Sequence, residues 1–129
     1  MIMSSKKIVL DFIDTWKNEK ALHVGMREYM LPDAVWENVG FSRTVGPEEA
    51  IQFMKKVVAE QGPAMANIDV DVVNIIEEGA MVVTERHDYL RDENGERKGL
   101  IRVVGIFEIK DGKIAAWRDY FDTASLAAH

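Results

Sequence analysis

The first third of the chain carries apolar residues at three- and four-residue spacing, the pattern of one buried helix face. A first helix is predicted after Ser4 and Ser5, whose hydroxyls can cap its amino end. A second helix is predicted from Ala21 to Tyr29 and should end at Leu31-Pro32, because the residue before proline avoids helical backbone. The buried face of the first helix consists of Ile8, Val9, Phe12, Ile13 and Trp16.

Two more elements are predicted before the middle of the chain. Residues 34–39 have the composition of a short strand and lie between Pro32-Asp33 and Gly40. Gly46-Pro47 introduces a third helix, because proline suits the first helical turn, and two following acids favour the helix dipole. Its apolar positions are Ile51, Phe53, Met54, Val57 and Val58.

Beyond Gly62-Pro63 the hydrophobic period changes from helical spacing to two, which indicates β-strands. Asn94-Gly95 and Asp111-Gly112 are strong hairpin-turn sequences. The predicted strands form an antiparallel meander over about residues 68–77, 81–91, 99–110 and 113–121.

Helices followed by a meander predict an α+β fold, with a curved antiparallel or mixed sheet wrapped around helices and an internal pocket. The 129 residues (14.6 kDa) are enough for one domain, residues 1–129, with one core. We expect the tail from Thr123 to His129 to fray.

Composition narrows the class of protein. Acids outnumber bases 22 to 16, for a net charge of −6, which argues against a nucleic-acid-binding protein. The sequence has no membrane span and no apolar run typical of a secretory signal. It also has no cysteine, which excludes disulfides and thiolate chemistry and fits a cytoplasmic protein. No metal site or other cofactor is expected, because His23 and His87 lack further ligands at useful spacing.

Three charged residues occupy strand faces that are otherwise apolar. Strand alternation places Arg86 and Asp88 together with Val82 and Leu90, and places Asp119 between two aromatic residues of the last strand, Trp117 and Phe121. A charge in such a position is either exposed with its neighbours or buried and paired.

An assumed strand register brings these charges together. A two-residue Asn94-Gly95 turn places Arg86 opposite Val103 and Asp88 opposite Ile101. A three-residue turn at Asp111-Gly112 then places Asp119 opposite Val103, so that Arg86 can bridge both carboxylates. A two-residue turn at Asp111-Gly112 would instead turn Asp119 to the other face.

Two carboxylates tied by one arginine in an apolar cavity can hold different protonation states and serve as an acid and a base. One can donate a proton to a substrate oxygen while the other deprotonates water, without cofactor or covalent intermediate. Asn38 can hold such a water through its side-chain carbonyl.

Two segments carry a further signal: residues 84–90, Thr-Glu-Arg-His-Asp-Tyr-Leu, and residues 112–122, which include Trp-Arg-Asp-Tyr-Phe-Asp. They resemble the limonene-1,2-epoxide hydrolase family, within the NTF2-like or SnoaL-like superfamily of cone-shaped folds. The resemblance implies one-step hydration of a small hydrophobic epoxide. By position, Asp119 corresponds to the base, Asp88 to the acid, Arg86 to the bridge and Asn38 to the water-holding amide.

One position departs from the family pattern. A Tyr-x-Asn pair is usual, whereas this sequence has Trp36-Glu37-Asn38, and an indole N–H cannot accept a hydrogen bond from water. The expected substrate pocket comprises Trp36, Trp117, Phe121, Leu90 and Val103. Outer-face residues such as Val83 and Ile106 need cover, so a homodimer is expected.

Other interpretations remain open at the level of sequence. The three charges can form a purely structural ion-pair network, and Asn38 can simply bond to backbone. The same fold also suits a ketosteroid-isomerase-like or polyketide-cyclase-like enzyme, or a binding module without activity.

Overall fold

The computed structural model describes residues 3–124 and begins with helices, as predicted. The helices are α1 (Ser5–Asp14), α2 (Glu19–Tyr29) and α3 (Pro47–Gln61), with short 3₁₀ helices η1 (Thr15–Lys17) and η2 (Pro63–Ala66). Ser4 caps α1 by accepting a hydrogen bond from the Lys7 backbone N–H, and Asn18 caps α2 by accepting one from the Ala21 backbone N–H. All three predicted α-helices are therefore confirmed.

Six strands form one mixed sheet among the described residues. The strands are β1 (Met30–Asn38), β2 (Ser42–Val45), β3 (Ile68–Glu78), β4 (Met81–Arg91), β5 (Arg97–Lys110) and β6 (Lys113–Phe121). Their order in the sheet is β2-β1-β6-β5-β4-β3. Strands β3 to β6 form the predicted antiparallel meander, whereas β1 pairs with β6 in parallel. The α+β class with a curved mixed sheet is confirmed.

The β1–β2 hairpin differs from the sequence prediction. Strand β1 begins at Met30, directly after α2 and four residues before the predicted start, and runs through Pro32. Strand β2 was not predicted, because four residues at a sheet edge carry too short an alternation to be recognised.

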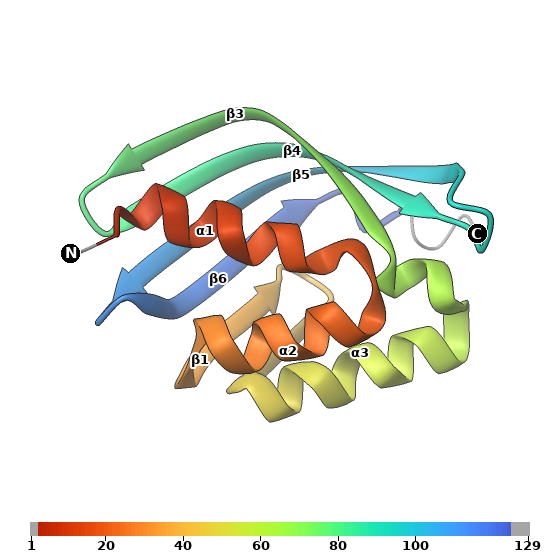
Figure 1. The fold of residues 1–129 in the computed structure, drawn as a ribbon, viewed down its shortest axis with the longest axis horizontal. Helices are drawn as coiled ribbons and strands as arrows, with labels where there is room; N and C mark the ends of the chain where they lie inside the picture. The colour runs from red at the N-terminus through yellow and green to blue at the C-terminus, as the bar shows by residue number, and fades with distance from the viewer. Residues whose placement is uncertain (1–2, 125–129) are drawn as a thin grey trace.

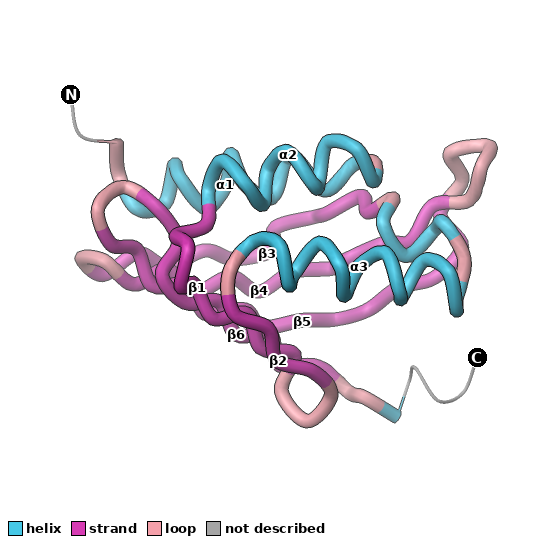
Figure 2. Tube along the Cα trace, turned by 90° about the horizontal axis from the view of Figure 1, so that it is seen from below, coloured by secondary structure: helices cyan, strands magenta, loops and turns pink. Residues whose placement is uncertain are grey.

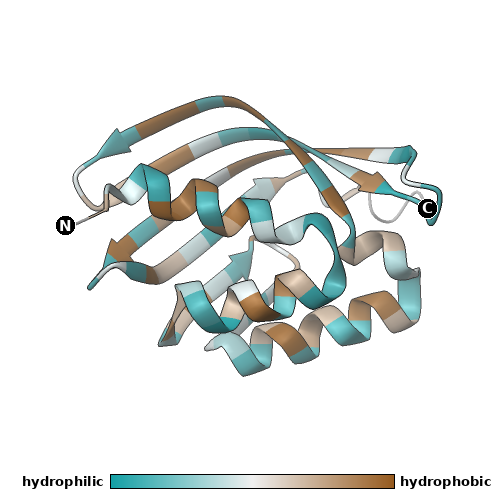
Figure 3. Ribbon diagram, viewed as in Figure 1, coloured by the Kyte–Doolittle hydropathy of each residue, from teal (hydrophilic) through white to brown (hydrophobic). Residues whose placement is uncertain are grey.

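The helices cover the concave face of the sheet (Figure 1), and in Figure 2 α1 and α2 lie above the curved sheet while α3 crosses in front of it. Hydrophobic and hydrophilic residues alternate along the strands and recur along the helices in Figure 3, as this arrangement requires. The core lies between the two layers and contains Val9, Phe12, Met26, Ile51, Phe107 and Ile114 among its most buried residues.

The β4–β5 register is confirmed, with Arg86 opposite Val103 and Asp88 opposite Ile101. The turn itself is longer than predicted, because Arg91 pairs with Arg97. One extra residue on β5, Lys98, then restores the expected pairing from Leu90 onward.

The β5–β6 register differs from the prediction by two residues, so Asp119 lies opposite Gly105 rather than Val103. The turn has two residues, and both Asp111 and Gly112 adopt positive φ, as tight hairpins require. Such a turn alone would place Asp119 on the outer face. A bulge at Ala115 adds one residue to β6 and returns Asp119 to the inner face.

No helix among the described residues is long and apolar enough to cross a membrane. The predicted fraying of the tail from Thr123 to His129 falls mainly on residues 125–129, which lie outside the described residues.

Candidate active site

The centre of the site is the fully buried side chain of Arg86 on β4. Its guanidinium forms a two-point contact with Asp88, from Nε and Nη2 at 3.1 and 3.0 Å. A second two-point contact joins Nη1 and Nη2 to Asp119 at 3.2 and 3.1 Å. Nη1 also donates to the Thr84 hydroxyl at 3.1 Å, so all five N–H donors of the arginine are used.

The absence of a side chain at Gly105 makes this arrangement possible. Thr84, Gly105 and Asp119 lie side by side on β4, β5 and β6. A Cβ at position 105 would lie 2.3 Å from Arg86 Nη1 and 2.6 Å from Asp119 Oδ1. The arginine therefore reaches across β5 to Asp119 through the space that a larger residue would fill.

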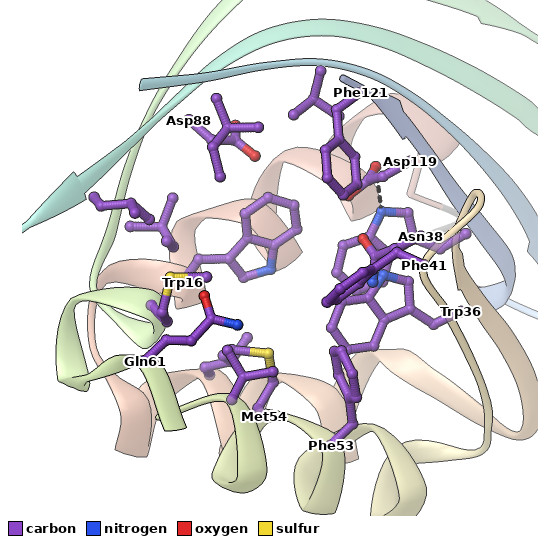
Figure 4. A pocket seen from close by; sticks show the side chains of 18 of the residues that line it. Trp16, Trp36, Asn38, Phe41, Phe53, Met54, Gln61, Asp88, Asp119 and Phe121 are labelled. Atoms are coloured by element: carbon purple, nitrogen blue, oxygen red, sulfur yellow. Dashed lines mark hydrogen bonds between the residues drawn. The ribbon is translucent and has the colours of Figure 1, made fainter. Parts of the chain in front are cut away.

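Asn38 enters the site through the parallel pairing of β1 with β6, in which it lies beside Asp119. The backbone N–H of the next residue, Val39, donates to the Asp119 carbonyl at 3.0 Å. The Asn38 amide Nδ2 donates to the Ser42 hydroxyl at 3.0 Å. In Figure 4 its carbonyl oxygen is turned toward the cavity.

A cavity of about 130 Å³ lies between this charged cluster and the helices. Asn38, Asp88 and Asp119 line it, together with all five residues of the predicted pocket: Trp36, Trp117, Phe121, Leu90 and Val103. Arg86 is buried behind the two carboxylates. Figure 4 shows Asp88 and Asp119 on the sheet side, and Trp16, Phe53, Met54 and Gln61 on the helical side. The cavity is thus apolar apart from a few oxygen and nitrogen atoms.

Stacked indoles form one wall of the cavity. The rings of Trp36 and Trp117 are 4.5 Å apart and nearly parallel, and Trp16 also stacks on Trp117 at 5.2 Å. Trp16 also lies against Arg86, whose Cζ is 5.0 Å from the ring centroid, close enough for a cation–π interaction. Trp117 donates its N–H to Asp119 Oδ1 at 2.8 Å. The indole N–H groups of Trp16 and Trp36 are buried without a partner among the described residues.

The electrostatics of the site follow from two carboxylates sharing one cation. Burial raises the pKa of Asp119 above its ordinary value, and the neighbouring Asp88 adds to the rise. Attraction to Arg86 and the hydrogen bonds from Arg86 and Trp117 oppose it. Burial alone would lower the pKa of Arg86, but Asp119 and Asp88 outweigh it and raise that pKa. Arg86 therefore stays charged, and two ionised carboxylates would bring two negative charges to its single positive charge.

Several residues of the site were missed by sequence reasoning. Trp16 was assigned to the core face of the first helix, and no pattern distinguishes a core residue from a cavity wall. Gly105 could have been noticed, because an isolated glycine within a strand often marks a close approach. Ser42 could not have been noticed from the sequence, because strand β2 was not predicted. Among residues 3–124, no group of three or more His, Asp or Glu side chains is placed to hold a metal ion.

Comparison with known proteins places these features in context. Residues 4–128 match the model of the limonene-1,2-epoxide hydrolase catalytic domain. A curated relative, epoxide hydrolase EphG of Mycobacterium tuberculosis, is 39% identical over 90 residues, which cover 70% of this chain and 56% of that protein. The matched region is therefore little more than half of EphG.

Solved structures agree with this match. The structure of an M. tuberculosis LEH-like epoxide hydrolase is 32% identical, with a TM-score of 0.74 over 96% of this chain and 86% of that chain. An NTF2-like protein of unknown function from Burkholderia pseudomallei K96243 is 18% identical, with a TM-score of 0.77 over 98% of this chain and 97% of that chain. At that identity the likeness shows the fold alone, which is NTF2-like.

Proposed function

The chain belongs to the limonene-1,2-epoxide hydrolase family, and on that premise we propose that it opens a small hydrophobic epoxide to a diol by one-step attack of water. The observation that carries the proposal is the pair of carboxylates, Asp88 and Asp119, that faces one apolar cavity and shares a single arginine. No cofactor takes part in the proposed reaction.

In this reaction Asp119 is the general base and Asp88 the general acid. Water forms a bond from its oxygen to one epoxide carbon as its proton passes to Asp119, and the bond between that carbon and the epoxide oxygen breaks. Asp88 gives its proton to the departing oxygen, which becomes the second hydroxyl. Return of a proton from Asp119 to Asp88 restores the starting state. Asn38 beside Asp119 holds the water, and Arg86 holds both carboxylates in place.

The environment of the pair suits these two roles. Because the pKa of Asp119 is raised, its carboxylate is a stronger base than one in water. Because two ionised carboxylates would carry one charge more than Arg86 neutralises, the pair can keep one proton, and that proton belongs to the pair as a unit. The alternative of a structural ion-pair network would not require both carboxylates to line a cavity.

The cavity supports a compact substrate. A cavity of about 130 Å³ compares with the ~150 Å³ of an apolar cavity that holds benzene, so a monocyclic epoxide is the class that we propose. The apolar walls contribute binding through desolvation, while the few polar atoms orient the epoxide. Limonene oxide, cyclohexene oxide and styrene oxide are therefore suitable test substrates.

The deciding experiment is turnover of these three epoxides in heavy-oxygen water. We expect a diol that carries one heavy oxygen, and a roughly 10²- to 10⁴-fold loss of kcat in both Asp119→Asn and Asp88→Asn. Asp33→Asn, which removes an exposed carboxylate from β1, is the matched control and should leave kcat unchanged.

Two results would contradict the proposal. One is the absence of diol from all three epoxides together with tight binding of a steroid-like ketone, which would favour the isomerase-like alternative. The other is full activity in both carboxylate variants, which would reduce the cluster to a structural role.

We also propose that the chain forms a homodimer through the outer face of its sheet. Ile76, Val104 and Tyr120 are exposed there by 65%, 43% and 44%, and Val83 and Ile106 lie between them, half-buried. Sedimentation analysis should give twice the chain mass, and Ile76→Lys should shift it toward the monomer. A monomer at high protein concentration would contradict this assignment.

We further propose that residues 1–129 form one domain and, because the sequence has no cysteine, that the protein is cytoplasmic.

A further inference from the structure

The Asn38 amide is useful to the proposed reaction in only one of its two orientations. An attacking water has two protons, of which one goes to Asp119 and the other needs an acceptor. The side-chain carbonyl of Asn38 can accept it, whereas the N–H of Trp36 can only donate. An amide rotated by half a turn would present its own N–H groups to the water, and would leave that second proton without an acceptor.

Contacts across the β1–β2 hairpin hold the amide. Ser42 is the register partner of Asn38, and its hydroxyl accepts the Nδ2 hydrogen bond at 3.0 Å. The Phe41 backbone N–H donates to the backbone carbonyl of Asn38 at 2.8 Å and closes the turn between the two strands. With Nδ2 bound to Ser42, Oδ1 faces the cavity, as Figure 4 shows.

We propose that Ser42 is a positioning residue, which keeps the Asn38 carbonyl oxygen directed at the water that Asp119 activates. This role rests on the proposed hydrolase function. Ser42 is not among the residues that line the cavity, and its hydroxyl is bound to the Asn38 amide, so it would act through Asn38. Because Asn38 holds the water rather than the substrate, loss of Ser42 should change kcat and leave KM nearly unchanged.

The first test compares Ser42→Ala, Ser42→Thr and Thr44→Val. Loss of the serine hydroxyl should lower kcat about 10- to 100-fold, the cost of a misplaced reacting group, while threonine restores it. Thr44 lies on the same strand, and its buried hydroxyl has no partner among the described residues, so Thr44→Val serves as the matched control. In an Asn38→Ala background, Ser42→Ala should have no further effect on kcat.

Equal losses in Ser42→Ala and Thr44→Val, or a loss confined to KM, would overturn the assignment while leaving the hydrolase function in place. The assignment would also be overturned if Ser42→Ala lowered kcat by the same factor in the Asn38→Ala background as in the wild type.

A second measurement decides the role of Ser42 independently of turnover. Nuclear magnetic resonance of the Asn38 side-chain amide should show one proton protected from solvent exchange in the wild type and in Ser42→Thr, and exposed to exchange in Ser42→Ala. Identical exchange in all three proteins would overturn the proposal. A wild type without activity on any epoxide would count against the hydrolase function alone, because amide exchange would still report on Ser42.

Discussion

Nη1 of Arg86 lies 2.3 Å from the point where a side chain on Gly105 would begin. The arginine on β4 and the aspartate on β6 are separated by a whole strand, and their contact passes over this one residue. A buried ion-pair cluster contributes only when its geometry is well satisfied, so the missing Cβ is a condition for the site to form.

Gly105→Ala should displace Arg86 from Asp119. Because the added methyl group would occupy the space through which the guanidinium reaches the carboxylate, we expect activity to fall at least 100-fold and stability by about 1–3 kcal/mol. Urea unfolding and epoxide turnover measure the two effects. Gly99→Ala, on the same strand, is the control, because its Cβ would meet only Leu90, at an ordinary distance of 3.6 Å. Equal effects of the two variants would contradict this explanation.

The pH dependence of turnover should report on Asp119. Protonation of this base stops the reaction, and its pKa is raised by burial, so the rate should fall on acidification at a pH above the ordinary aspartate range. The hydrogen bond from Trp117 favours the ionised form and lowers that pKa. Trp117→Phe should therefore move the acid limb of kcat/KM to higher pH. Trp36→Phe, which removes no hydrogen bond to Asp119, should leave the limb in place, and a shift to lower pH in Trp117→Phe would contradict the assignment.

Stability should depend on pH in the opposite sense to that of an ordinary ion-paired aspartate. The folded state holds the Asp119 proton more tightly than the unfolded chain does, so its ionisation costs stability as pH rises from the unfolded pKa through the folded one. Asp119→Asn removes this cost and keeps an acceptor for Arg86. Relative to the wild type, the variant should gain stability between about pH 4, near the unfolded value, and neutrality. Thermal unfolding of both proteins across that pH range tests this, and Asp33→Asn is the control for loss of one charge. If the stability difference between Asp119→Asn and the wild type became smaller as pH rises, the prediction would be contradicted.

Trp36→Tyr should restore a hydroxyl where this chain carries an indole. One more oriented hydrogen bond to the attacking water is worth about 0.5–1.5 kcal/mol, which corresponds to a roughly 2- to 10-fold rise in kcat. The smaller ring loses stacking against Trp117, so stability should fall. Trp36→Phe should show the same loss of stability without the gain. If Trp36→Tyr were no faster than Trp36→Phe, the missing hydroxyl would not limit the orientation of the attacking water.

The sequence by itself determined the elements and the faces of the strands. Side chains alternate strictly along a strand, so the placement of Arg86 and Asp88 on the apolar face of β4 followed from period alone. The helices, the cap of α1 and the antiparallel meander were also predictable, because each depends on residues close together in the chain.

Only the tertiary structure decided how the site closes. A bulge at Ala115 has no periodic signal, yet it sets the face on which Asp119 lies. The parallel pairing of β1 with β6 joins segments some 80 residues apart and brings Asn38 to Asp119, and the unpredicted strand β2 brings Ser42 to Asn38. These contacts depend on the path of the whole chain, whereas periodicity reports only the local backbone, and so the charged residues could be recognised from sequence while the geometry that joins them could not.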